Sequence, residues 1–174
     1  MTTVGVLALQ GAFAKHLEML RSLGVEAIEV RTPKDLEKCD ALVIPGGEST
    51  AILKHIHYIG LSDVFHQFAK EGKPVFGTCA GLILMAQEII GFPMTPFKLL
   101  EIAVERNAFG RQAESFKTPI NLNFAGKQVK PFSAVFIRAP RIRSYSPNVK
   151  ILATYEDEPV LVQQGPYLGA TFHP

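Results

Sequence analysis

The chain of 174 residues is 47% hydrophobic and 20% charged, with a formal net charge of +2. This composition favours one globular domain over two small lobes, and it lacks the basic excess typical of nucleic-acid-binding proteins. The longest apolar runs, such as GLILMA at residues 81–86, are too short to span a bilayer, and the N-terminal MTTVGVLAL lacks the basic region and cleavage site of a signal peptide. We therefore predict a cytoplasmic protein that binds neither nucleic acid nor a membrane.

Short apolar strands alternate with helical patterns over the first half of the chain. This alternation, with short connections, is typical of a parallel sheet with helices on both faces. Strands are predicted at residues 4–9, 25–30, 41–44 and 73–77. Helices are predicted from Phe13 to about Gly24, from the PGGEST segment to about Gly60, from an N-capping Ser62 to about Gly72, and over residues 80–90.

The second half has weak helical periodicity and many Pro and Gly residues. Strands are predicted there at residues 100–104, 120–124, 134–137, 150–154, 160–164 and 167–172. The fold class that we predict is therefore α/β, a doubly wound three-layer αβα arrangement. Its sheet is mostly parallel, with antiparallel strands added in the second half.

The segment GTCAGL places Cys79 where a predicted strand turns into a predicted helix. Ligands of open α/β sheets bind at such turns, and a tight turn needs the small neighbours that surround this cysteine. The N-terminus of the following helix should lower the pKa of the thiol from its ordinary value of about 8.5. The amide of Ala80 should point to a forming oxyanion. The alternative is a small cysteine packed in the core, which is our interpretation of Cys39, and both thiols should be free.

A cysteine nucleophile needs a base, and the chain has five histidines. His16, His55, His57 and His66 lie on predicted helices and fit solvated or partly buried faces. His173 follows the last predicted strand, whose end could share an edge of the sheet with Cys79, so it is the candidate base.

The segment PGGES at residues 45–49 follows the third predicted strand. Its adjacent glycines allow positive φ and close approach of a ligand to the backbone, so one of its amides could donate to an oxyanion. A plain turn capped by Ser49 or Thr50 is the alternative. A phosphate-binding loop is disfavoured because the pattern GxxxxGK(S/T) is absent.

The segments ALVIPGGEST, GTCAGL, VERNAFGRQAESF, FIRAP and the final FHP, in this order, resemble the glutaminase subunit family of pyridoxal 5′-phosphate synthase. The likeness covers essentially the whole chain. It implies one class I glutamine amidotransferase-like domain over residues 1–174, with a flavodoxin-like fold. It also implies hydrolysis of L-glutamine to glutamate and ammonia for vitamin B6 synthesis, a (β/α)₈-barrel synthase as partner, and no metal or organic cofactor.

The resemblance also implies roles for individual residues. Cys79 would be the nucleophile and His173 its base, and the amides of Gly47 and Ala80 would form the oxyanion hole. The segment LQGAF at residues 9–13 resembles the part that meets the synthase. The glutamine site would comprise Gly46, Gly47, Glu48, Arg106, Ile137 and Arg138.

The family motif continues FHPE and then a C-terminal helix, whereas the sequence in hand ends at Pro174. We expect either that this end of the family domain has been cut away or that the protein lacks the glutamate that orients the histidine. Two alternatives follow from the sequence. One is a glutamine-binding or scaffolding subunit that is inactive without that glutamate, and the other is an amidotransferase of another pathway.

Overall fold

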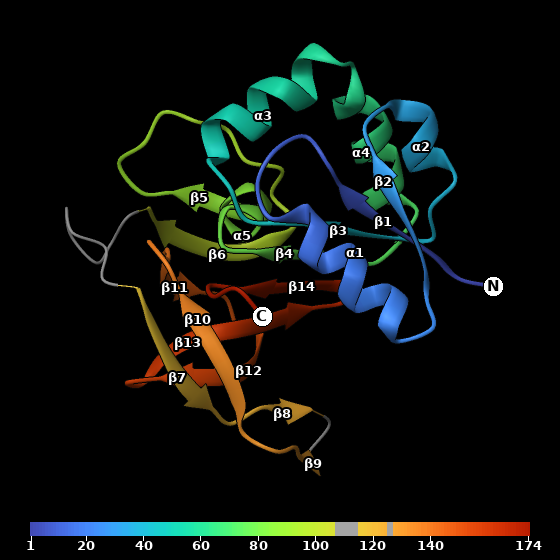
Figure 1. Cartoon of the computed structure of the whole chain (residues 1–174). Helices are drawn as coiled ribbons and strands as arrows, with labels where there is room; N and C mark the ends of the chain where they lie inside the picture. Colours follow the sequence, from blue (N-terminus) through green and yellow to red (C-terminus); the bar gives the residue numbers. More distant parts are fainter. Residues whose placement is uncertain (107–114, 125–126) are drawn as a thin grey trace.

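The computed structural model describes residues 1–106, 115–124 and 127–174 (Figure 1). Residues 107–114, which contain most of the predicted motif VERNAFGRQAESF, lie outside the described residues, as do residues 125–126. Within the described residues, no helix is long and apolar enough to cross a membrane.

A seven-stranded sheet forms the centre of the molecule, and its order is β12-β13-β14-β4-β3-β1-β2. The five strands from β14 to β2 are mutually parallel, whereas β12 and β13 pair antiparallel at one edge. The predicted α/β fold with a mostly parallel sheet is therefore confirmed. The strands are β1 (Thr3–Leu7), β2 (Glu26–Val30), β3 (Ala41–Ile44), β4 (Val75–Thr78), β12 (Lys150–Tyr155), β13 (Glu158–Gln164) and β14 (Tyr167–Ala170).

Helices cover this sheet on both faces, because the inner strands of the parallel part (β1, β3, β4 and β14) are mostly apolar on both sides. Figure 1 shows α2, α3 and α4 grouped along the top of the molecule, away from α1. Leu17 of α1 packs with Val6, Ala27 and Val43 of the sheet. The helices are α1 (Phe13–Ser22), α2 (Pro33–Glu37), α3 (Ser49–Tyr58), α4 (Leu61–Lys70) and α5 (Ala80–Met85).

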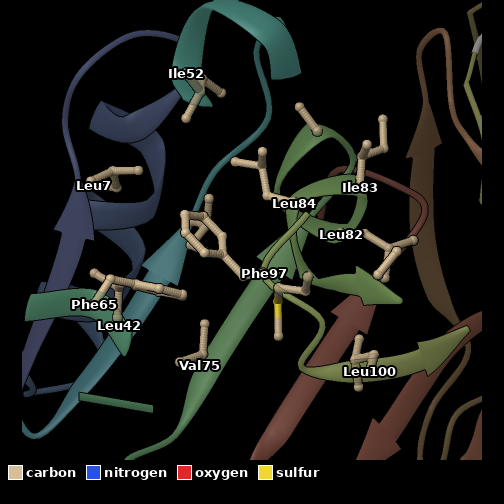
Figure 2. Packing of buried hydrophobic residues seen from close by; sticks show 14 of the residues in the cluster. Leu7, Leu42, Ile52, Phe65, Val75, Leu82, Ile83, Leu84, Phe97 and Leu100 are labelled. Carbon is tan, nitrogen blue, oxygen red and sulfur yellow. The ribbon is translucent and has the colours of Figure 1, made fainter. Parts of the chain in front are cut away.

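The largest apolar cluster lies between the sheet and α2 to α5. Figure 2 shows Ile52, Phe65 and Leu84, from three of these helices, gathered with side chains of β1 and β3. Phe65 lies with its ring centroid 4.4 Å from that of Phe97, which closes the cluster from the loop after β5. This packing fixes α3 and α5, and therefore the loops that precede them.

Three smaller sheets complete the described fold. β6 (Leu100–Glu105) lies between β5 (Ala86–Ile89) and β11 (Arg141–Tyr145). β7 (Phe116–Ile120) pairs antiparallel with β10 (Phe132–Phe136), and β8 (Asn123–Phe124) with β9 (Lys127–Gln128). Figure 1 shows these two pairs at the lower edge of the molecule.

The prediction of one helix over residues 80–90 is wrong beyond Met85. The helix ends there because the loop between β5 and β6 donates hydrogen bonds to its last carbonyl groups. The N–H of Phe97 donates to Leu84 O at 2.8 Å, and that of Leu99 donates to Met85 O at 2.9 Å. Residues 86–89 then form β5, which pairs with β6. The sequence GLILMAQEII is apolar enough for a buried helix or a buried strand, so periodicity could not separate the two.

Other predicted boundaries need smaller corrections. Gly60, not Ser62, is the N-cap of α4, with φ of 72°, and Ser62 instead forms a hydrogen bond of 2.6 Å between its Oγ and Nδ1 of His57. The predicted strand at residues 120–124 is divided between the end of β7 and β8. α2 and β11 were not predicted, because α2 has only five residues and β11 carries three polar residues in RIRSY.

Candidate active site

Cys79 occupies the turn between β4 and α5. Its φ of 51° and ψ of −107° form a conformation that is strained for a residue with a side chain. The turn is tight because a Cβ on Gly81 would collide with the carbonyl oxygen of Ile44. The strained turn with small neighbours that the sequence predicted is therefore confirmed, and it leaves Cys79 only 7% exposed.

His173 reaches the same edge of the sheet from β14. The Cys79 N–H donates to Ala170 O at 2.9 Å, so the two segments leave the sheet side by side. Two hydrogen bonds then fix the backbone of His173 against Val135, with N···O distances of 2.8 and 3.2 Å. The imidazole lies against Gly46, so closely that a Cβ on this glycine would collide with Cε1 of the ring.

The PGGES loop lies between the histidine and α3. Gly47 has φ of 157°, in a region that side chains disfavour. The N–H of Glu48 donates to Oε1 of Gln10 at 2.9 Å, which ties the loop to the end of the first strand segment. The sequence did not single out Gln10 by itself, although its place just beyond β1 at the carboxyl edge of the sheet was a signal for it.

The carboxylate of Glu48 caps α3 and also meets Arg106. It accepts from the amides of Thr50 at 3.2 Å and Ala51 at 2.6 Å, so Glu48 is the N-cap, and not Ser49 or Thr50 as in the alternative interpretation of this loop. Arg106 donates to Glu48 Oε1 at 3.3 Å and to Thr50 Oγ1 at 3.2 Å. Although burial raises the pKa of Glu48, these amides and the Arg106 charge outweigh it, so the carboxyl keeps a pKa below its usual value.

A cavity of about 430 Å³ joins these parts. The Sγ of Cys79 donates to Ile137 O at 3.8 Å on one side of it, and Arg138 follows with a strained φ of 45°. Gly11, Ala12, Ser49 and Ile83 also line the cavity and were not among the predicted site residues. All nine predicted site residues line it, namely Gly46, Gly47, Glu48, Cys79, Ala80, Arg106, Ile137, Arg138 and His173.

The pKa of Cys79 is opposite to the sequence-based prediction. Burial raises the pKa of the Cys79 thiol to about 11, and the hydrogen bond from the Ala80 amide lowers it only in part. Burial, together with the nearby Lys15 charge, lowers the pKa of His173. The helix dipole is weak here because α5 has only six residues and the sulfur has left water. At neutral pH the cavity therefore contains a thiol and a neutral imidazole.

The other histidines lie on helices, as predicted. His55 and His57 are exposed on α3, and the ring of His66 on α4 lies 5.4 Å from that of Phe97. None of them lines the cavity. His16 on α1 is half-buried, and its pKa is lowered by burial and by the charge of His173. Of the five histidines, all of which the structure describes, His173 alone lines the cavity that contains Cys79.

Cys39 lies in the core, as the sequence predicted. It is 1% exposed, its Sγ donates to Asp35 O at 3.3 Å, and burial raises its pKa to about 11. Both cysteines are free. In the described part of the chain, no group of three or more His, Cys, Asp or Glu side chains is placed to hold a metal ion.

Comparison with known proteins identifies the family. The sequence pattern of the SNO glutamine amidotransferase family matches residues 6–174. The chain belongs to this family. Among curated relatives of this SNO-family chain, pyridoxal 5′-phosphate synthase subunit PdxT of Desulforamulus reducens is 49% identical, over 98% of this chain and 90% of its own. The subunit PdxT of Thermosipho africanus is 47% identical, over 98% of this chain and 89% of its own.

Comparison with solved structures agrees with the assignment of this chain to the SNO family. A crystal structure of a glutamine amidotransferase superposes with a TM-score of 0.89 at 49% identity, covering 98% of this chain and 89% of the other. The structure of PurLQS from Thermotoga maritima matches with a TM-score of 0.70 but only 16% identity, over 99% of this chain and 87% of its own, so it shows a shared fold alone. The two alternatives, an inactive scaffolding subunit or an amidotransferase of another pathway, are therefore not favoured.

Proposed function

We propose that Cys79 and His173 perform the hydrolysis of L-glutamine in this chain, in the cavity lined by the PGGES loop and Arg106. Membership of the SNO family makes the chain a glutaminase subunit of pyridoxal 5′-phosphate synthase. The observation that carries the residue assignments is the convergence of a strained cysteine, a histidine and a glycine loop on one cavity. The three segments are far apart in the sequence, and the sheet edge brings them together.

The first half of the reaction begins with a proton transfer. Because the free chain holds a thiol and a neutral imidazole, His173 takes the Sγ proton of Cys79 as the sulfur attacks the side-chain amide carbon of glutamine. The amide oxygen becomes an oxyanion, which the N–H groups of Gly47 and Ala80 stabilise. The C–N bond then breaks, and His173 returns the proton to the leaving nitrogen, which departs as ammonia.

The second half of the reaction releases glutamate. A thioester joins Cys79 to the former side-chain carbon of the substrate. His173 removes a proton from water, the oxygen attacks the thioester carbon, and the same two amides stabilise the second oxyanion. The C–S bond breaks, and Cys79 regains its proton from the imidazolium. No metal ion or organic group takes part in these steps.

The charged side chains of the cavity suit an amino acid substrate. Free glutamine carries an α-ammonium and an α-carboxylate, and the cavity presents the carboxylate of Glu48 beside the guanidinium of Arg106. We assign the α-ammonium to Glu48 and the α-carboxylate to Arg106 with Arg138. Gly46 and Ile137 then line the path of the apolar part of the substrate. Such pairing selects for a free amino acid over the same amide in a peptide chain.

Ammonia from this reaction passes to the synthase partner of the complex. We propose that the partner is a (β/α)₈-barrel protein and that the segment at residues 9–13 contacts it. Gly11 and Ala12 of this segment are exposed and also line the cavity, so a partner bound there would touch the active site directly. Gln10 would transmit this contact to the amide of Glu48.

The test is ammonia release from L-glutamine, measured with and without the synthase partner. Cys79→Ala should abolish ammonia release. Cys39→Ala removes the other buried cysteine and is the control: once the variant is shown to be folded, it should release ammonia as the wild type does. The synthase should raise the turnover, because ammonia made without a consumer wastes glutamine. Release that survives Cys79→Ala, or a complex that forms without any release, would refute the proposal.

A further inference from the structure

Phe92 holds an unusual position against Arg106. The guanidinium carbon of Arg106 lies 3.9 Å from the centroid of the Phe92 ring, well inside the range of a cation–π contact. Phe92 does not line the cavity, and its side chain is 37% exposed. No step of the proposed reaction uses it, so its contact with a residue of the substrate site needs its own explanation.

The sheet places the two residues together. β5 and β6 are parallel, with Ile89 opposite Val104, and the N–H of Ile90 donates to Val104 O at 2.8 Å. Phe92 and Arg106 each follow this last rung by two residues, so both leave the sheet at the same edge. Gly91, with φ of 67°, makes the turn that directs the chain toward Arg106.

Arg106 is then restrained from three directions. The ring of Phe92 covers one face of the guanidinium, Thr50 Oγ1 accepts from Nη1, and Glu48 Oε1 accepts from Nη2. The Arg106 side chain is only 18% exposed as a result. A guanidinium has five N–H donors in one plane, and the partners within the described residues leave donors in that plane for a carboxylate.

We propose that Phe92 is a positioning residue for the substrate, acting through Arg106. Its ring holds the guanidinium plane at the angle at which the free donors meet the α-carboxylate of glutamine. Without the ring, Arg106 could rotate about its long side chain while keeping one of its two hydrogen bonds, and binding would then cost the entropy of ordering it again. This inference rests on the proposed function of Arg106 in binding glutamine.

The test compares two substitutions of similar volume in the complex with the synthase. Phe92→Leu keeps apolar bulk but removes the π face, whereas Phe92→Tyr keeps the face. Phe92→Leu should raise the KM for L-glutamine about fivefold, which corresponds to about 1 kcal/mol, and leave kcat within a factor of two. Phe92→Tyr should keep the wild-type KM. Tyr145→Leu, which changes an exposed ring on β11 outside the cavity, is the matched control and should change neither constant.

Two further measurements separate the possible failures. In a Cys79→Ala background, calorimetry reports the Kd of L-glutamine without chemistry, and Phe92→Leu should weaken it by the same factor. In an Arg106→Ala background, Phe92→Leu should have no further effect, because its partner is gone. Absence of any glutamine binding to Cys79→Ala would overturn the proposed function itself. Normal binding that Phe92→Leu does not change, or an equal loss with and without Arg106, would overturn only the role of Phe92.

Discussion

Adding one methyl group at Gly46 should disable the histidine without unfolding the protein. The backbone of Gly46 does not have a positive φ, so alanine is conformationally acceptable there. Its Cβ, however, would collide with Cε1 of His173 and lie 3.0 Å from Nδ1. Non-bonded carbon atoms in contact prefer about 3.5–4.0 Å, so the ring must move by about 1 Å. The backbone of His173 cannot follow, because its two hydrogen bonds to Val135 fix it.

The larger expected loss is in turnover. A misplacement of about 1 Å of a reacting group costs about 10²-fold in rate, so Gly46→Ala should lower kcat about 100-fold. The KM should rise by a smaller factor, because the new methyl also borders the proposed path of the apolar part of the substrate, whereas Glu48 and Arg106 are unchanged. The assay is steady-state ammonia release by the complex with the synthase, together with thermal unfolding of each variant.

A second glycine provides the control for Gly46→Ala. Gly24 has φ of 78°, and a Cβ there would meet nothing within 4 Å, so Gly24→Ala adds backbone strain without a collision. It should lower the free energy of unfolding by about 1 kcal/mol and leave kcat unchanged. A folded Gly46→Ala variant that keeps kcat within threefold of wild type would refute the assignment of His173 as the base.

Three other predictions concern the same site. Iodoacetamide should alkylate Cys79 of the isolated protein slowly at pH 7 and faster toward pH 11, because burial raises the pKa of the thiol to about 11. Peptide mass spectrometry identifies the alkylated residue. An alkylation rate that levels off below pH 8 would contradict the raised pKa. Glu48→Ala should lower the free energy of unfolding by about 1 kcal/mol, because α3 loses its N-cap, and it should also raise the KM. Glu48→Gln should raise the KM with a smaller loss of stability. If Glu48→Ala and wild type unfold at the same urea concentration, the carboxylate does not stabilise α3 as its cap. Thr78→Val should leave the free energy of unfolding unchanged or raise it by up to about 1 kcal/mol, because the Thr78 hydroxyl is buried without a hydrogen-bond partner among the described residues. A clear decrease in the free energy of unfolding, measured in the same urea titration, would show that this hydroxyl is paired.

Much of the fold could be read from local patterns. β3 begins and ends at the predicted residues, and α1, α3 and α4 lie where helical spacing predicts them. The break between α5 and β5 could not be read, because it depends on amides of Phe97 and Leu99 that come from the following loop. A run that is apolar on every face carries no periodic signal with which to choose.

The sequence by itself predicted the chemistry that we propose for the site, because short motifs contain the residue types that it needs. A cysteine among small residues at a strand-to-helix turn, two adjacent glycines after another strand, and a histidine after the last one were enough to predict that Cys79, the PGGES loop and His173 share a site. Their geometry follows from the parallel sheet, whose strands all end at one edge. Arg106, Ile137 and Arg138 were implied only by the family resemblance.

Only the tertiary structure decided the protonation state of these groups and the contacts that hold them in place. The pKa of Cys79 is raised because surrounding segments remove its sulfur from water, and no motif records how deeply a side chain is buried. Gln10 and Phe92 contact the site because separate strands pair in the folded chain, β1 with β3 and β5 with β6. Burial and long-range contacts are properties of the assembled chain, whereas a motif specifies only its own residues.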